Sequence, residues 1–116
     1  MEFDPIEIST RWSTILAFIE KSFGKHPDGV EAVLFLIGVQ ELGKGRDNFT
    51  KEEKQDLMHI ATCKVLSYFG FYKLEGQDQD GWPIWKLEKP LPSINLKEQE
   101  IILKASIIEY FNQEVF

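Results

Sequence analysis

The chain of 116 residues has the length of one small domain, and its 43% hydrophobic and 28% charged residues are ordinary for a globular protein in water. A formal net charge of −6 disfavours non-specific attraction to nucleic acid and to anionic lipid, because both are polyanions. The single cysteine, Cys63, rules out an internal disulfide and suits a reducing compartment. The longest apolar run, residues 32–39, is far shorter than the roughly 20 residues that cross a membrane. We therefore expect a cytoplasmic protein without membrane attachment, with one domain over residues 1–116.

The N-terminal part of the chain predicts two helices. Residues 4–7, Asp-Pro-Ile-Glu, are typical of a capped helix start, and Gly24 marks the end of that helix. A second start is predicted at Asp28, where Glu31 completes the same capping pattern. The residues that follow are apolar on every side, and such a helix must be covered by its neighbours on most faces. We therefore expect this second helix at the centre of a bundle.

A third helix and a β-hairpin are predicted in the middle of the chain. Thr50 with Glu53 forms a capping box, apolar residues then recur at helical spacing, and Gly70 ends the run. Aromatic and branched residues beyond Gly70 favour two strands on either side of a turn rich in Gly and Asp at 76–81. The hairpin should therefore cover residues 71–88, approximately.

The last helix is predicted from Asn95, which with Glu98 repeats the capping pattern, through residue 111. The fold class expected is mainly α: a small four-helix bundle with a β-hairpin inserted between helices 3 and 4. This is the order of elements in a winged-helix domain, which is an analogy at the level of the fold alone.

A weak metal site is suggested along the third helix. Asp56, His59 and Cys63 fall on one stripe, with Glu52 one turn earlier, and all four residue types bind transition metals. The alternative is that the stripe is the solvated side of an amphipathic helix. Helical zinc motifs pair two histidines and this stripe has one, so neither a metal nor any other cofactor is predicted.

The connector before the third helix is the most basic part of the chain. Lys44, Arg46 and Lys51 lie close to the expected N-terminus of that helix, where free N–H groups and the helix dipole favour an anion. Neighbouring carboxylates dilute the charge, so a connector with solvated side chains is the competing interpretation.

Aromatic residues supply the candidate partner-binding side chains. Trp82 and Trp85 should lie on opposite faces of the return strand, so one of them would be exposed beside Tyr72 as a binding anchor. The alternative is that both pack against the last helix. Tyr110 and Phe111 add to an apolar last helix that ends in two further apolar residues, Val115 and Phe116.

Three classes of function remain open from the residues alone. A winged-helix DNA-binding regulator is one, but between residues 50 and 89 six lysines face seven carboxylates and no arginine is present. A small-molecule or metal-binding protein, or an enzyme, is another, with Glu41, Asp56 and His59 meeting between helices 2 and 3. No catalytic residue is predicted. We favour a non-enzymatic interaction or regulatory module that acts by protein–protein contact and associates with itself.

Two stretches, residues 39–72 (VQELGKGRDNFTKEEKQDLMHIATCKVLSYFGFY) and 78–85 (DQDGWPIW), resemble a family of short proteins of unknown function from Bacteroidetes-type bacteria. The resemblance implies a small cytoplasmic bacterial protein. It implies no activity and no catalytic residues.

Overall fold

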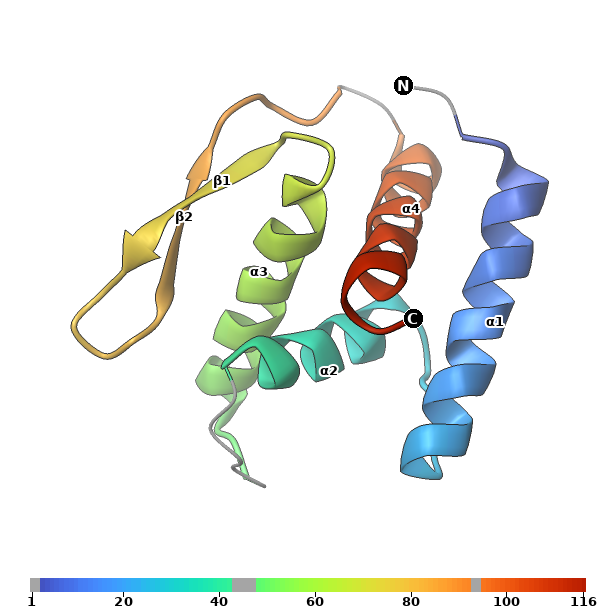
Figure 1. The fold of residues 1–116 in the computed structure, drawn as a ribbon, viewed down its shortest axis with the longest axis horizontal. Coiled ribbons are helices and arrows are strands. Elements are labelled where there is room, and N and C mark those ends of the chain that lie inside the picture. Colours follow the sequence, from blue (N-terminus) through green and yellow to red (C-terminus); the bar gives the residue numbers. More distant parts are fainter. Residues whose placement is uncertain (1–2, 43–47, 93–94) are drawn as a thin grey trace.

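The computed structural model describes residues 3–42, 48–92 and 95–116. It confirms the mainly α fold with a two-stranded antiparallel hairpin between the third and fourth helices (Figure 1). The elements are α1 (Pro5–Phe23), α2 (Val30–Leu42), α3 (Lys51–Ser67), β1 (Tyr72–Gln77), β2 (Pro83–Leu87) and α4 (Leu96–Glu114).

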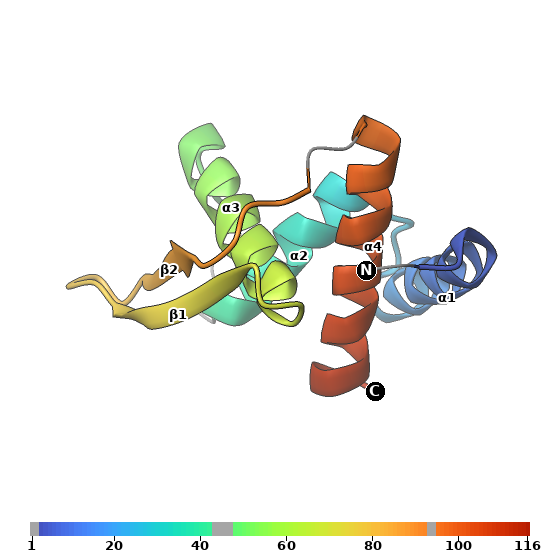
Figure 2. The same cartoon turned by 90° about the horizontal axis from the view of Figure 1, so that it is seen from above.

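The helices α3 and α4 lie side by side at the centre of the molecule, and α2 crosses both of them (Figure 1). The helix α1 packs on α4 at one edge, whereas the hairpin packs on α3 at the opposite edge (Figure 2). The position of α2 differs from the expected centre of a bundle. Its apolar residues are covered because two helices cross it, and several of them remain half-buried.

The main core is built from side chains of all four helices. Its large, fully buried side chains are those of Ile15, Ile19, Val33, Val65 and Ile107. At the crossing of α2 and α3 the backbones touch, because a Cβ built on Gly38 would lie 2.7 Å from the carbonyl carbon of Leu57. Only glycine allows this approach without displacing a helix.

Three of the four predicted helix caps are present. Asp4 accepts a hydrogen bond from the Ile6 N–H at 3.0 Å, and Asn95 accepts one from the Glu98 N–H at 2.9 Å. Thr50 and Glu53 form the complete reciprocal box. The predicted cap at Asp28 is wrong. The helix α2 begins at Val30, and the cap position is Gly29, whose carbonyl accepts the first helical hydrogen bond from the Val33 N–H at 3.2 Å.

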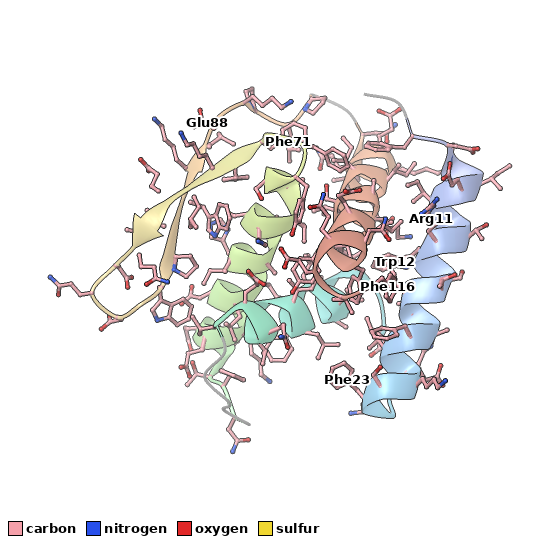
Figure 3. The ribbon with its side chains drawn as sticks, viewed as in Figure 1. Arg11, Trp12, Phe23, Phe71, Glu88 and Phe116 are labelled. Carbon is pink, nitrogen blue, oxygen red and sulfur yellow. The ribbon has the colours of Figure 1, made fainter. Side chains whose placement is uncertain are left out.

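The end of α3 fixes the start of the hairpin. Gly70 has the left-handed φ of 81°, its N–H donates to Ser67, and the Phe71 N–H donates to Leu66 at 3.2 Å. This pair of hydrogen bonds is a Schellman motif, and Leu66 and Phe71 pack together in a second small cluster as that motif favours. The carbonyl of Phe71 also accepts the Glu88 N–H at 2.9 Å, so both ends of the hairpin are tied to one turn (Figure 3).

The turn of the hairpin is held by one aspartate. The Asp78 side chain accepts hydrogen bonds from the backbone N–H groups of Asp80 and Trp82, both at 2.9 Å. The strand pairing shifts between Leu74 and Gly76, which is a β-bulge.

Among the described residues, no helix combines the length and the apolar character that crossing a bilayer requires.

Candidate functional site

A groove of about 400 Å³ opens where the C-terminal halves of three helices converge. We call it the C-terminal groove. Its walls come in equal parts from α1, α2 and α4: Phe18, Ile19, Ser22, Phe23, Leu36, Ile37, Gln40, Glu41, Tyr110, Phe111, Glu114 and Val115. Its volume falls in the range of ligand pockets, and most of these side chains are apolar.

The polar end of the C-terminal groove belongs to a cluster of five side chains. Tyr110 donates its hydroxyl proton to Glu41 at 3.2 Å, and Tyr68 donates to Glu114 at 2.9 Å. The ammonium of Lys64 lies between the two carboxylates, 3.8 Å from Glu41 and 3.5 Å from Glu114. We call these residues the tyrosine–carboxylate cluster. It ties α2, α3 and α4 together.

The tyrosines of this cluster are hydrogen-bond donors and not bases. Burial raises the pKa of Tyr68 and of Tyr110 well above the ordinary value of 10.0, and the adjacent carboxylates Glu114 and Glu41 raise it further. Both hydroxyls therefore keep their protons at neutral pH. The cluster can bind and orient a group, but its phenols are held in the form that does not abstract a proton.

Among the described residues, the charged side chains in the wall of the C-terminal groove are two carboxylates, Glu41 and Glu114. Lys64 pairs with both of them but is not part of the wall. The C-terminal ends of α1, α2 and α4 also converge here, and a helix C-terminus carries the negative end of the helix dipole. Charge and dipole therefore favour a positively charged group in this groove.

Exposed apolar side chains border the C-terminal groove. Phe23 is 66% exposed, Val115 is 44% exposed and Phe116 is 60% exposed. The ring of Phe116 packs edge-on against Phe18 in the groove wall, with 5.1 Å between ring centroids. In Figure 3, Phe23 lies at the last turn of α1 and Phe116 at the end of α4, between α4 and α1. We call these three residues the rim.

The sequence prediction named two aromatic residues of this groove, Tyr110 and Phe111, as partner-binding side chains. They are only 2% and 6% exposed and form buried wall. The exposed apolar positions of the C-terminal segment are Val115 and Phe116. The sequence does not show which neighbours cover the two rings: Phe18 of α1 packs on Phe111, and Glu41 of α2 binds Tyr110.

The hairpin residues Tyr72, Trp82 and Trp85 are half-buried. Trp82 precedes β2, so the alternation of strand faces does not apply to it. The hairpin packs on α3, so neither the expected exposed tryptophan nor the alternative of burial against the last helix is found. Within the described chain the indole N–H of Trp85 is buried without a hydrogen-bond partner.

The stripe of Asp56, His59 and Cys63 does not assemble as a metal site. Cys63 is fully buried, whereas Asp56 and His59 are exposed. The Sγ atom lies 3.7 Å from Nε2 of His59, and burial raises the pKa of the thiol from 9.0 to about 11, an effect that a hydrogen bond with Tyr72 opposes. No group of three or more His, Cys, Asp or Glu side chains in the described ranges is placed to hold a metal ion.

The solvated-face interpretation of that stripe is right for two residues and wrong for Cys63, because the hairpin side of α3 is not open to solvent there. For the predicted anion site, Lys44 and Arg46 lie outside the described residues. Lys51 is exposed at the first position of α3.

A second groove, of about 800 Å³, lies between the N-terminal halves of α2 and α4 and the middle of α3. We call it the N-terminal groove, and its walls include His59 and the carboxylates of Asp28, Glu31 and Glu100. The expected site of Glu41, Asp56 and His59 is not assembled. Glu41 lines the C-terminal groove, His59 lines the N-terminal groove, and Asp56 lines neither.

Four important residues were not singled out from the sequence: Phe23, Lys64, Tyr68 and Glu114. The spacing of Lys64 and Tyr68, and of Tyr110 and Glu114, is four residues, which places each pair on one helix face. That spacing was the available signal. Nothing in the sequence indicates that the two pairs meet, because α3 and α4 are separated by the hairpin.

Comparison with known proteins finds no matching family model, no similar curated protein and no similar solved structure. The resemblance to short Bacteroidetes-type proteins therefore stays a prediction.

Proposed function

We propose that this protein is a non-catalytic module that acts by protein–protein contact through the C-terminal groove and its rim. The observation that carries the proposal is the continuity of the apolar groove wall with the exposed Phe23, Val115 and Phe116. A site for a small molecule buries most of its ligand inside a pocket. Apolar surface that extends beyond the groove fits a larger occupant, such as a helix of a partner protein.

The chemistry of the groove supports contact in preference to catalysis. Its tyrosine hydroxyls are protonated and already donate to carboxylates. The thiol of Cys63 is buried beneath the hairpin with a raised pKa, which is the unreactive state of a cysteine. A regulatory role in the cytoplasm belongs to the same proposal, and the unpaired Cys63 is compatible with a reducing compartment.

A selection of displayed helical peptides against the purified protein tests the proposal. We expect enrichment of peptides with apolar anchors at helical spacing, because such anchors fill a groove between helices. Binding of the selected peptides should weaken about tenfold in the variant Gln40→Trp, since Gln40 is an exposed wall residue and a large side chain there fills the groove.

The matched control is Gln55→Trp, which places the same side chain on an exposed position of α3 outside both grooves. Selected peptides should bind this variant as they bind the natural protein. Failure to enrich any peptide, or peptides that bind Gln40→Trp undiminished, would show that the C-terminal groove is not a protein-binding surface.

A further inference from the structure

The end of α1 presents an apolar anchor next to a positive charge. Phe23 is 66% exposed, and Lys25, just past the Gly24 cap, is exposed too. Lys21 is also exposed, but residues two positions apart do not share a helix face, so it projects from another side of α1. Oε2 of the nearby Glu20 lies 3.0 Å from Nδ1 of His26. Among the residues that the structure describes, Lys25 takes part in no ion pair. This segment therefore has the features that suit a negatively charged apolar groove.

The C-terminal groove of the same chain has the complementary features. Its walls are mostly apolar, and the charge of its two carboxylates, Glu41 and Glu114, is only half offset by the one ammonium of Lys64. The side chain of Glu114 is 43% exposed and that of Glu41 is 27% exposed, so both can reach a group that enters the groove. Anchor and groove thus carry opposite charge on one surface of one molecule.

We propose that the occupant of the C-terminal groove is a second copy of this chain, docked so that each Phe23 enters the groove of its partner. Phe23 is itself part of the groove wall. A two-fold axis beside Phe23 therefore brings each anchor to the opposite groove, and both contacts form at once. A two-fold contact of this kind uses the same surface on both subunits and closes without leaving a free site.

In this dimer Lys25 of one protomer lies against Glu41 and Glu114 of its partner. The pairing offsets the excess negative charge of each groove. The proposal rests on the proposed function, because it names the partner that uses the same groove.

Sedimentation velocity of the purified full chain, from micromolar to near-millimolar concentration, tests this dimer. We expect a concentration-dependent shift from 13.5 kDa to twice that mass. In Phe23→Ser the dissociation constant should rise at least about tenfold, since a central aromatic anchor is lost. The control is Ile6→Ser on the same helix, because Ile6 is 78% exposed but lies far from the groove, and it should dimerise normally.

The charge pairing has a separate test. The variant Lys25→Glu should dissociate about tenfold more readily than the natural chain, and salt should weaken the natural dimer more than this variant. The matched control Lys21→Glu reverses the same charge on another side of α1 and should dimerise as the natural chain does. Circular dichroism checks that each variant is folded, which is expected because every substituted side chain is exposed. A dimer that Lys25→Glu leaves unchanged would overturn the charge pairing.

The remaining outcomes separate this inference from the proposed function. A natural chain that stays at 13.5 kDa throughout overturns the second copy as the occupant, while groove-dependent binding of selected peptides would still support the protein-contact function. A dimer insensitive to both Phe23→Ser and Gln40→Trp would show assembly through another surface, which also overturns the inference.

Discussion

The two grooves are lined by opposite halves of α2 and α4, together with α3 in the N-terminal groove and α1 in the C-terminal groove. The N-terminal groove receives the N-termini of α2 and α4, whose dipoles offset part of the negative charge of Asp28 and Glu31. The C-terminal groove receives helix C-termini, whose dipoles add to the charge of Glu41 and Glu114. Carboxylates alone therefore do not define the electrostatics of a groove, because the helix dipoles around them either offset part of their charge or add to it.

The grooves also differ in how firmly their polar side chains are held. In the C-terminal groove, Glu41 and Glu114 each accept a tyrosine hydroxyl and share one lysine from another helix. In the N-terminal groove, Glu100 pairs with Lys104 of its own helix. Side chains held from several helices are preorganised, and preorganisation lowers the cost of binding. We therefore favour the smaller groove as the candidate binding site.

The largest expected effect comes from displacing α2, a helix that lines both grooves. Gly38→Ala places a methyl group on the carbonyl of Leu57, so α2 must move away from α3. Overpacking of this kind should lower the free energy of unfolding by about 2–4 kcal/mol. Urea unfolding measures the loss, with Gln40→Ala on the exposed side of α2 as a control that should stay within about 0.5 kcal/mol. A small loss for Gly38→Ala would mean that the helix crossing is looser than the structure describes.

The next effect compares the two lysines that pair with carboxylates of the grooves. Lys64→Met leaves the carboxylates of Glu41 and Glu114 without their shared cation, and we expect a loss of about 1–2 kcal/mol. Lys104→Met removes an ammonium that also lies over an aromatic ring but pairs with Glu100 alone, so about 0.5 kcal/mol is expected. Methionine keeps most of the aliphatic stem in both cases. Equal losses in urea unfolding would remove the distinction between the two grooves.

A third effect concerns alkaline pH. The pKa of Tyr68 and of Tyr110 is raised in the folded chain, so ionisation of either phenol favours the unfolded chain. Their contribution is complete below roughly pH 10, the unfolded pKa of tyrosine, and is lost as the pH rises toward the folded pKa. The stability of the natural chain should therefore fall above about pH 10 more steeply than that of the variant Tyr68→Phe, Tyr110→Phe.

Ionisation of Cys63, whose pKa is raised from 9.0 to about 11, also lowers the stability of the folded chain as the pH rises. Cys63 is present in both proteins, so its contribution cancels in the comparison. Each lost hydroxyl should also cost about 1 kcal/mol at neutral pH. Parallel pH profiles for the two proteins would contradict the raised pKa values of these tyrosines.

The fold followed from local rules, and the site did not. The capping residues Thr50 and Asn95 and the terminator Gly70 act within a few residues of their own positions, so their consequences are readable from the sequence. The cap at Asp28 was placed one residue early because Gly29 can also occupy a cap position.

The tyrosine–carboxylate cluster depends on contacts between residues far apart in the chain. Tyr110 meets Glu41 across 69 positions, and Tyr68 meets Glu114 across 46. Such pairs follow from the crossing angles of α2, α3 and α4, which no periodicity specifies. Cys63 was misjudged for the same reason, since a helical pattern does not show which face a later hairpin will cover.

The smallest expected effect lies in the N-terminal groove. Glu100 is 54% exposed and its pair with Lys104 spans 3.7 Å on one helix face, so Glu100→Gln should change the free energy of unfolding by less than about 0.5 kcal/mol. It should leave groove-dependent peptide binding and dimer formation unaltered. The matched change, Glu114→Gln, removes half of the groove carboxylates and a charged acceptor of Tyr68, so it should weaken both associations. Glu100 and its partner Lys104 lie on one helix and do not line the C-terminal groove, so their substitution should not change that groove. If Glu100→Gln weakened both associations as much as Glu114→Gln, the N-terminal groove would be part of the same binding surface.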